Sequence, residues 1–169
     1  MHLEMPMLRR CLAVLFLILM ANQAAAVSPN IVISQVYGGG GNSGATYTND
    51  FVELFNRSAT TVSVNGWSVQ YASATGTTWA TVGLSGSIPA GGYYLVRMAG
   101  GATGATLPTA DAATTGINMS ATTGKVALVN STTPLTGSGC PFGATVIDFV
   151  GFGGTADCAE GTRTAAPSN

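Results

Sequence analysis

The acidic side chains offer this sequence its clearest catalytic chemistry, because a pair of carboxylates can hydrolyse a glycosidic bond. Glu53 stands between aromatic residues in Phe51–Phe55, and its plausible partners are Asp50 and Asp148. Asp50 and Glu53 are three residues apart, so on a strand they face opposite sides. We expect Glu53 on an outward strand face as a hydrogen-bonded carboxylate; a perturbed acid or a ligand is the alternative.

Nucleophilic chemistry has less support. The only histidine is His2, which lies in a segment that we expect to be removed on export. Its removal excludes Ser-His and Cys-His nucleophiles and histidine-ligated metals. Lys125 is the only lysine, so an activated serine would need an unusual Ser-Lys arrangement. We therefore assign no catalytic residue and no cofactor, and we expect a chain that is not an enzyme.

Oxygen-bearing side chains could hold a calcium ion, which takes roughly six to eight oxygen ligands. The candidates are Asn42, Asn49, Asp50, Asp148, Asp157 and Glu160. Their spacing matches no known calcium loop, so we expect them in separate loops and assign no metal site. Calcium binding by loop 38–50 stays the alternative. Gly38–Gly41 could cradle an anion, but no Lys-Ser/Thr follows it, and we expect a flexible connection between strands.

The first 26 residues have the pattern of a secretory signal peptide. Arg9 and Arg10 precede an apolar run, and Ala24-Ala25-Ala26 provides a small-residue cleavage site. The run from Cys11 to Ala21 is about half of the ~20 residues that a membrane span needs. We predict cleavage after Ala26 and export to the periplasm, the cell surface or the medium, with no membrane span. Translation could start at Met1, Met5 or Met7.

Export leaves two cysteines, Cys140 and Cys158, in a compartment where oxidation is expected. A Cys140–Cys158 disulfide is the natural interpretation, and free thiols or metal ligands are the alternatives. The positive charges that remain after residue 26 are Arg57, Arg97, Lys125 and Arg163. They form no basic cluster, so direct nucleic-acid binding by a basic patch is not expected.

The remaining chain predicts strands and turns. Short β-branched and aromatic runs are bounded by Gly, Asn and Pro. These runs are Ile31–Tyr37, Phe51–Asn56, Thr61–Val64, Trp67–Tyr71, Leu84–Ile88, Tyr93–Met98, Lys125–Val129 and Thr145–Val150. Asn65-Gly66 suits a hairpin turn. One helical turn is considered near Ile117–Ala121. In Trp67–Tyr71 the apolar residues should face the core, while Ser68 and Gln70 face away from it. About eight strands without a crossover helix predict an all-β, antiparallel β-sandwich.

Aromatic side chains could also serve binding. Five of them, Tyr37, Tyr47, Trp79, Tyr93 and Tyr94, cannot all face the core. Those at the surface could stack on sugars or dock on a partner, and the alternative is that they cap the edges of the sandwich. Three glycosylation patterns begin at Asn56, Asn118 and Asn130, and we interpret them as accidents of composition.

Five segments in order resemble the lamin tail domain family over about residues 30–150. They are Asp50–Ser58 (DFVELFNRS), Gly66–Gln70 (GWSVQ), Pro89–Val96 (PAGGYYLV), Ala99–Gly104 (AGGATG) and Val126–Thr132 (VALVNST). Two further segments, Tyr37–Asp50 and Gly139–Phe142, resemble the bacterial secreted branch of that family.

The resemblance implies an immunoglobulin-like β-sandwich and a noncatalytic module, since such domains are often attached in bacteria to exported nucleases of the endonuclease/exonuclease/phosphatase class. We therefore expect a signal peptide at 1–26 and one domain at 27–169, with a C-terminal truncation left open. The expected function is a secreted, monomeric module for attachment to an unknown protein or cell-surface partner. The alternative is an accessory part of an extracellular nuclease whose catalytic domain is missing from this chain.

Overall fold

The computed structural model describes residues 28–137 and 139–167, so the expected signal peptide at 1–26 lies outside the described residues. The described chain is all-β. Its strands are β1 Ile31–Tyr37, β2 Asn49–Asn56, β3 Val62–Ser63, β4 Ser68–Ala72, β5 Ala80–Gly83, β6 Ser87–Ile88, β7 Tyr93–Gly100, β8 Ala112–Ala113, β9 Gly124–Val129 and β10 Val146–Phe152. No helix in this part of the chain is long and apolar enough to cross a membrane.

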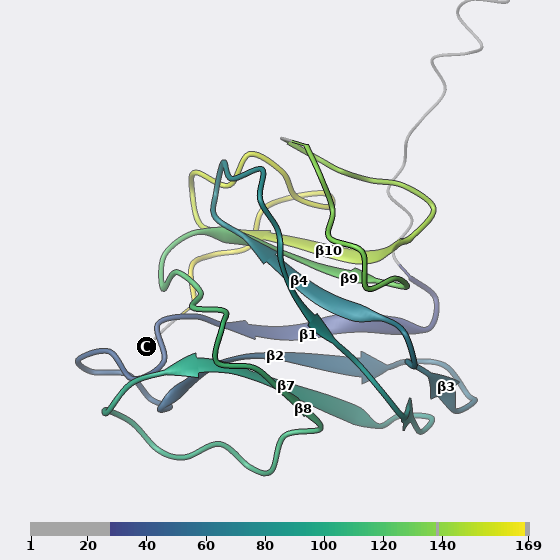
Figure 1. Ribbon diagram of the computed structural model, residues 1–169, viewed down its shortest axis with the longest axis horizontal. Helices are drawn as coiled ribbons and strands as arrows, with labels where there is room; N and C mark the ends of the chain where they lie inside the picture. Colours follow the sequence, from purple (N-terminus) through teal and green to yellow (C-terminus); the bar gives the residue numbers. More distant parts are fainter. Residues whose placement is uncertain (1–27, 138, 168–169) are drawn as a thin grey trace, which may run out of the picture.

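Two four-stranded sheets face each other (Figure 1). The first has the order β1-β2-β7-β8 and the second has the order β10-β9-β4-β5, while β3 and β6 form a separate pair. The predicted β-sandwich is therefore confirmed. One pairing departs from the antiparallel expectation, because β8 lies parallel to β7, with Val96 opposite Ala112. The chain leaves β7, crosses below the first sheet in Figure 1 and returns to add β8 at its edge.

The core lies between the two sheets. Its fully buried side chains come from both, and they include Ile31, Val52, Leu54, Val69, Val96, Met98, Val126, Leu128 and Phe152. These positions alternate with outward-facing ones in β1, β2 and β7, as a strand period of two requires. The alternation in these three strands determines which of their residues reach the outer face of the first sheet.

Strand prediction failed where the sequence is rich in small residues. β5 and β8 were missed, because both are short and contain alanine or glycine, which carry little strand preference. Ile117–Ala121 forms no helical turn. Ile117 and Met119 are buried and Asn118 is exposed, an alternation that places this segment in an extended conformation along the core.

The turn at Asn65-Gly66 is present, with Gly66 at φ 75° and Trp67 N–H donating to the Val64 carbonyl at 3.1 Å. It does not close a hairpin, because β3 pairs with β6 whereas β4 lies in the second sheet. The turn therefore carries the chain from one pair of strands to another.

The outer face of the second sheet is covered rather than exposed. Ser68 and Gln70 of β4, expected on a solvent face, are both fully buried. The Gln70 amide donates to the Thr133 carbonyl at 3.0 Å and accepts from Leu135 N–H at 2.8 Å. These bonds hold the connection between β9 and β10 over the sheet, so the polar face of β4 anchors a covering loop.

Candidate functional site

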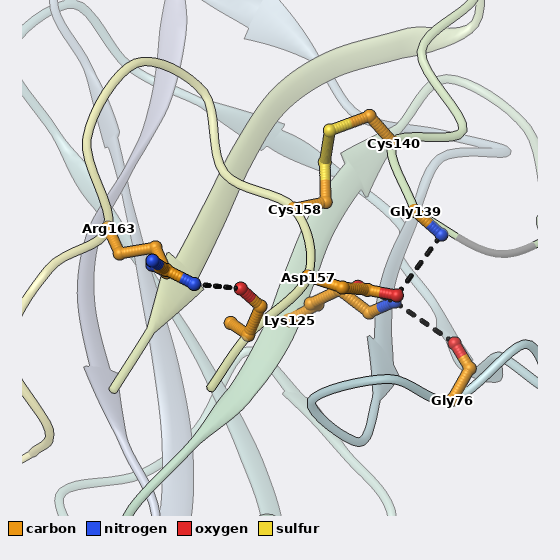
Figure 2. The surroundings of a disulfide bond; sticks show 8 residues. Gly76, Lys125, Gly139, Cys140, Asp157, Cys158 and Arg163 are labelled. Carbon is orange, nitrogen blue, oxygen red and sulfur yellow. Dashed lines mark hydrogen bonds and ion pairs between the residues drawn. A yellow bond between two sulfur atoms is a disulfide. The ribbon is translucent and has the colours of Figure 1, made fainter. Parts of the chain in front are cut away.

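Lys125 is the most unusual charged residue in the interior. Its side chain is fully buried in β9, and its ammonium donates to Asp157 Oδ1 at 2.6 Å and to the Gly76 carbonyl at 3.0 Å (Figure 2). The ammonium also lies 5.5 Å from the centroid of the Trp79 ring. Its hydrogen bond to Asp157 lowers the pKa of that carboxyl. Because neither hydrogen-bond partner is a serine, Lys125 serves as a structural anchor and not as a Ser-Lys base.

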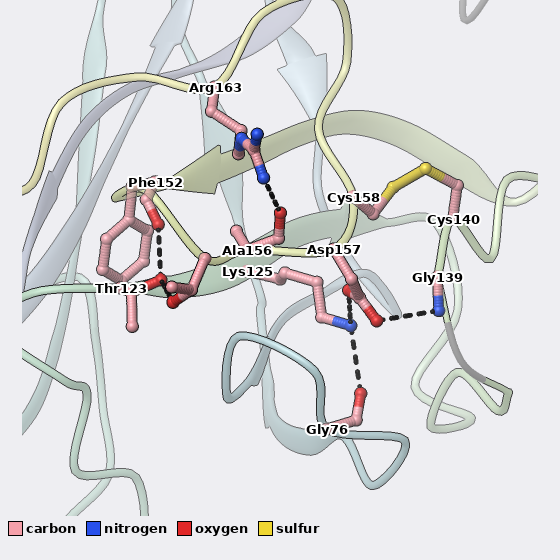
Figure 3. A network of polar contacts seen from close by, with 11 residues as sticks. Gly76, Thr123, Lys125, Gly139, Cys140, Phe152, Ala156, Asp157, Cys158 and Arg163 are labelled. Atoms are coloured by element: carbon pink, nitrogen blue, oxygen red, sulfur yellow. Dashed lines mark hydrogen bonds and ion pairs between the residues drawn. A yellow bond between two sulfur atoms is a disulfide. The ribbon is translucent and has the colours of Figure 1, made fainter.

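A disulfide between Cys140 and Cys158 stands beside this ion pair, with the two Cα atoms 5.0 Å apart. Gly139 N–H donates to Asp157 Oδ2 at 3.2 Å. Because these residues directly precede the two cysteines, the segments joined by the disulfide are also joined by this hydrogen bond. Figure 3 shows a further bond, in which Arg163 donates to the Ala156 carbonyl at 2.6 Å. Disulfide, ion pair and arginine together hold the segment after β10 against the second sheet.

Asp50 is a structural residue beneath the glycine-rich connection. Its buried carboxylate accepts N–H groups from Gly40 and Met119, both at 2.6 Å. Burial raises the pKa of Asp50, and these backbone bonds oppose the rise. Gly38–Gly40 is buried, and a Cβ on Gly40 would stand 2.1 Å from the Asn49 carbonyl carbon. The expected flexible connection is therefore a packed one, in which small residues allow close approach.

Asp148 and Glu160 form a pair of neighbouring carboxyls. Asp148 Oδ2 accepts the Ile33 N–H at 2.5 Å across the gap between β10 and β1. Burial raises the pKa of both carboxyls, and the charge of Asp148 raises that of Glu160 further. Within residues 28–137 and 139–167, no group of three or more His, Cys, Asp or Glu side chains could hold a metal ion. The carboxylates considered for calcium contact different partners: Asp50 contacts Gly40, Asp157 contacts Lys125, and Glu160 lies against Asp148.

The two other carboxylates of the described chain line one surface cleft. Glu53 lies on the outer face of β2, and Asp111 immediately precedes β8. The cleft has a volume of about 320 Å³ and opens on the outer face of the first sheet. It is lined by Gln35, Tyr47, Phe51, Glu53, Tyr93, Leu95, Leu107, Pro108, Thr109 and Asp111. Strands β1, β2 and β7 form its floor, and the connection from β7 to β8 forms one wall.

Aromatic rings border the cleft at both ends. Tyr93 is 61% exposed, the only large hydrophobic side chain so exposed in the described chain, and its ring centroid lies 4.8 Å from that of Phe55. Tyr47 meets Phe51 edge to face at 5.7 Å, and Phe51 stacks on Tyr37 at 5.3 Å. Tyr93 thus presents ring surface to solvent, while the other rings support one another.

Of the five aromatic residues singled out from the sequence, only Tyr47 and Tyr93 line this cleft. Tyr37, Trp79 and Tyr94 are buried. The Tyr94 hydroxyl donates to the Ser85 carbonyl at 2.9 Å, which allows the ring to enter the core without losing its polar partner.

Glu53 lies on the outward strand face, as the sequence indicated. Its Oε1 accepts the Ser34 hydroxyl at 2.7 Å and the Gln35 amide at 3.2 Å. Asp50 lies on the opposite side of β2, so these two carboxylates cannot act on one glycosidic bond. Asp111 and the Leu107–Thr109 wall were missed, since an acid in an irregular connection carries no periodic signal. The cleft has the features of a binding surface.

One glycosylation pattern is structurally blocked. Asn56 is fully buried, and its amide donates to the carbonyls of Thr60 and Ile88, both at 2.8 Å. Asn118 and Asn130 are exposed.

Comparison with known proteins identifies a family. The family model of the Lamin Tail Domain covers residues 24–153, a range that contains the whole cleft and Cys140 but ends before Asp157 and Cys158. No curated protein matches the chain.

Proposed function

The chain belongs to the lamin tail domain family, a family of noncatalytic immunoglobulin-like modules, and from this premise we propose that it is an exported attachment module. The contact surface in this proposal is the aromatic cleft on the outer face of the first sheet. Attachment is the function that this surface supports best, because its side chains offer an exposed aromatic ring and hydrogen-bonding groups.

The observation that carries the proposal is the difference between the two outer faces. The outer face of the second sheet is covered by the β9–β10 connection, which packs a second apolar cluster around Trp79, Phe149 and Cys158. The outer face of the first sheet keeps an open cleft with Tyr93 exposed. A partner therefore has access to one sheet, and specific contact surfaces combine such aromatic groups with a polar rim.

Retention on bacterial envelopes tests the attachment function. We expect the exported chain to be retained, and Tyr93→Ser to reduce retention severalfold, because it removes the exposed ring without touching the core. Thr133→Ser is the control, since Thr133 is exposed on the loop that covers the other sheet. Equal retention of all three proteins, or hydrolase activity of the purified chain that is lost in Glu53→Gln, would contradict the proposal.

Export is part of the proposal and rests on the Arg9-Arg10 pair, the apolar run and the Ala24–Ala26 site. Fusion of residues 1–26 to a reporter enzyme should send the reporter out of the cytoplasm, and mass spectrometry of the exported chain should find a new N-terminus at Val27. A reporter that stays in the cytoplasm would contradict export.

The second candidate function is an accessory role in an extracellular nuclease. It is supported by the resemblance of Tyr37–Asp50 and Gly139–Phe142 to the bacterial secreted branch, whose domains often accompany such enzymes. DNA sequencing beyond the codon for Asn169 separates the two candidates. Continuation into an α/β domain rich in His, Asp and Asn would support the nuclease role, and an immediate stop codon would remove it.

A further inference from the structure

We propose that the cleft binds an arginine side chain on an extended segment of a partner protein, an inference that rests on the proposed attachment function. The juxtaposition behind it is that Glu53, Asp111 and the exposed ring of Tyr93 line one cleft with apolar walls.

Charge is the first argument. Six carboxylates lie in residues 28–167. Asp50 and Asp148 are buried, Asp157 is paired with Lys125, and Glu160 lies against Asp148. The two that remain, Glu53 and Asp111, both line the cleft, and neither belongs to an ion pair within the described chain. The cleft therefore carries two carboxylates that have no partner cation within the described chain. Charge complementarity favours a positively charged ligand for it.

The backbone brings the two carboxylates to opposite sides of one residue. Glu53 is the cross-strand neighbour of Leu95. On the other side, Leu95 N–H donates to Asp111 Oδ2 at 2.7 Å, and the Leu95 carbonyl accepts the Asp111 N–H at 2.9 Å. Within the described chain, no hydrogen bond engages Glu53 Oε2 or Asp111 Oδ1. Each carboxylate thus keeps one oxygen for a ligand lying over Leu95.

The uncharged lining favours arginine over a compact cation. Tyr93 offers an exposed ring on which a planar guanidinium can stack, and such cation–π contacts are more common for arginine than for lysine. Leu95, Leu107 and Pro108 can cover the apolar stem of the side chain, which packs on such surfaces while its charged end stays hydrated. A cavity of about 320 Å³ has room for one such side chain and part of its neighbours.

Arg97 marks the boundary of the acidic area. It is exposed on the same face of β7 as Tyr93 and Leu95, and its cross-strand neighbour is Phe51. Since it carries the same charge as the ligand, its replacement should strengthen binding slightly. Replacing Arg97 should raise the affinity, whereas replacing either carboxylate should lower it. This difference in sign distinguishes an electrostatic site from nonspecific hydrophobic binding.

Binding can be measured by fluorescence anisotropy with a labelled Gly-Arg-Gly-Arg peptide and the full chain. The control probe replaces both arginines with citrulline, which keeps the shape and removes the charge. We expect the citrulline peptide to bind about tenfold or more weakly, a lysine peptide to be intermediate, and salt to weaken the arginine peptide. Equal binding of the arginine and citrulline peptides would overturn the proposal.

Variants locate the site. Glu53→Gln and Asp111→Asn should each weaken the arginine peptide by about threefold to fivefold, as expected for exposed ion pairs, and Arg97→Ala should strengthen it. Glu160→Gln makes the same chemical change outside the cleft and should leave affinity unchanged. Thermal unfolding of each variant confirms folding. Peptide binding that is insensitive to both cleft carboxylates would refute the site.

A neutral oligosaccharide provides the competing class of ligand. If a glucan or chitin hexamer binds in a manner that depends on Tyr93 while the arginine peptide does not bind, the inference is wrong but the attachment function stands. Failure of the attachment function itself has a different signature, namely envelope retention that Tyr93→Ser leaves unchanged.

Discussion

Lys125 shows at the residue scale how one charge can be tolerated inside a small sandwich. A buried ammonium without a partner is strongly destabilising, because burial removes its hydration. Here the ion pair with Asp157 and the Gly76 carbonyl replace that hydration. The aliphatic stem of Lys125 meanwhile fills space in β9, so the residue contributes to packing as well as to charge balance.

Removing only Asp157 from the ion pair should therefore lower the free energy of unfolding more than removing both charges. Asp157→Ala should lower the free energy of unfolding by about 3 kcal/mol, because the ammonium of Lys125 stays buried without its counter-ion. The double variant Lys125→Met/Asp157→Ala should recover most of this loss, since methionine has a similar shape and no charge. Urea denaturation measures both. A double variant as unstable as Asp157→Ala would show that the charge is not the cause.

Gly40 gives a purely steric case. A Cβ at this position would stand 2.1 Å from the Asn49 carbonyl carbon and 2.4 Å from the Asp50 nitrogen, which are backbone atoms that cannot move aside. Gly40→Ala should lower the free energy of unfolding by about 2–4 kcal/mol. Gly154→Ala is the matched control, because a Cβ there meets nothing within 4 Å. Equal stability of the two variants in urea would contradict the steric argument.

At the scale of elements, the covering layer over the second sheet consists of chain without regular structure. The β9–β10 connection is attached at one end through Gln70. At the other end, Cys140 joins it to Cys158, in the segment that follows β10. Thr164 in turn ties the segment after β10 to the end of that strand. Its N–H donates to the Gly151 carbonyl and its carbonyl accepts the Gly153 N–H, both at 3.0 Å. The disulfide thus links two irregular segments that the strands alone would leave separate.

Loss of the disulfide should destabilise the covering layer before it unfolds the sandwich. Cys140→Ser/Cys158→Ser should lower the free energy of unfolding by about 3 kcal/mol, as the loop-entropy model gives for a sequence separation of 18. Proteolysis under native conditions should then cut first between residues 130 and 145, while the sandwich remains folded. Cleavage that begins instead in the first sheet would show that the disulfide does not hold this layer.

At the scale of the whole molecule, sequence periodicity predicted the sandwich because its longer strands carry β-branched and aromatic residues, as in Ile31–Tyr37 and Tyr93–Met98. Short edge strands such as Ala112–Ala113 were invisible, since pairing with β7 and not their composition makes them strands. The polar face of β4 was misplaced for a similar reason: only the fold shows that a loop covers Gln70. Of the cleft, the sequence indicated the aromatic residues Tyr47 and Tyr93. The residues of its wall were not predicted, because they come from the irregular connection between β7 and β8.

The carboxyls together determine how the stability of the molecule depends on pH. Burial raises the pKa of Asp50, Asp148 and Glu160 above their ordinary values of 3.8, 3.8 and 4.5. The folded state therefore binds these protons more tightly than the unfolded state, and the free energy of unfolding should rise as pH falls from neutral toward about 4. Asp157 has the opposite sign, because Lys125 lowers its pKa below 3.8.

The stability that Asp157 contributes is present above pH 3.8 and is lost as pH falls through its lowered pKa. The melting temperature should therefore pass through a maximum near pH 4, in the window between the two groups of carboxyls. Asp148→Asn/Glu160→Gln should flatten the rise between pH 7 and that maximum, and Asp157→Asn should flatten the fall below it. A melting temperature that decreases steadily from pH 7 downward would contradict the assignment, because it would mean that the buried carboxyls are held by their hydrogen bonds in the ionised form.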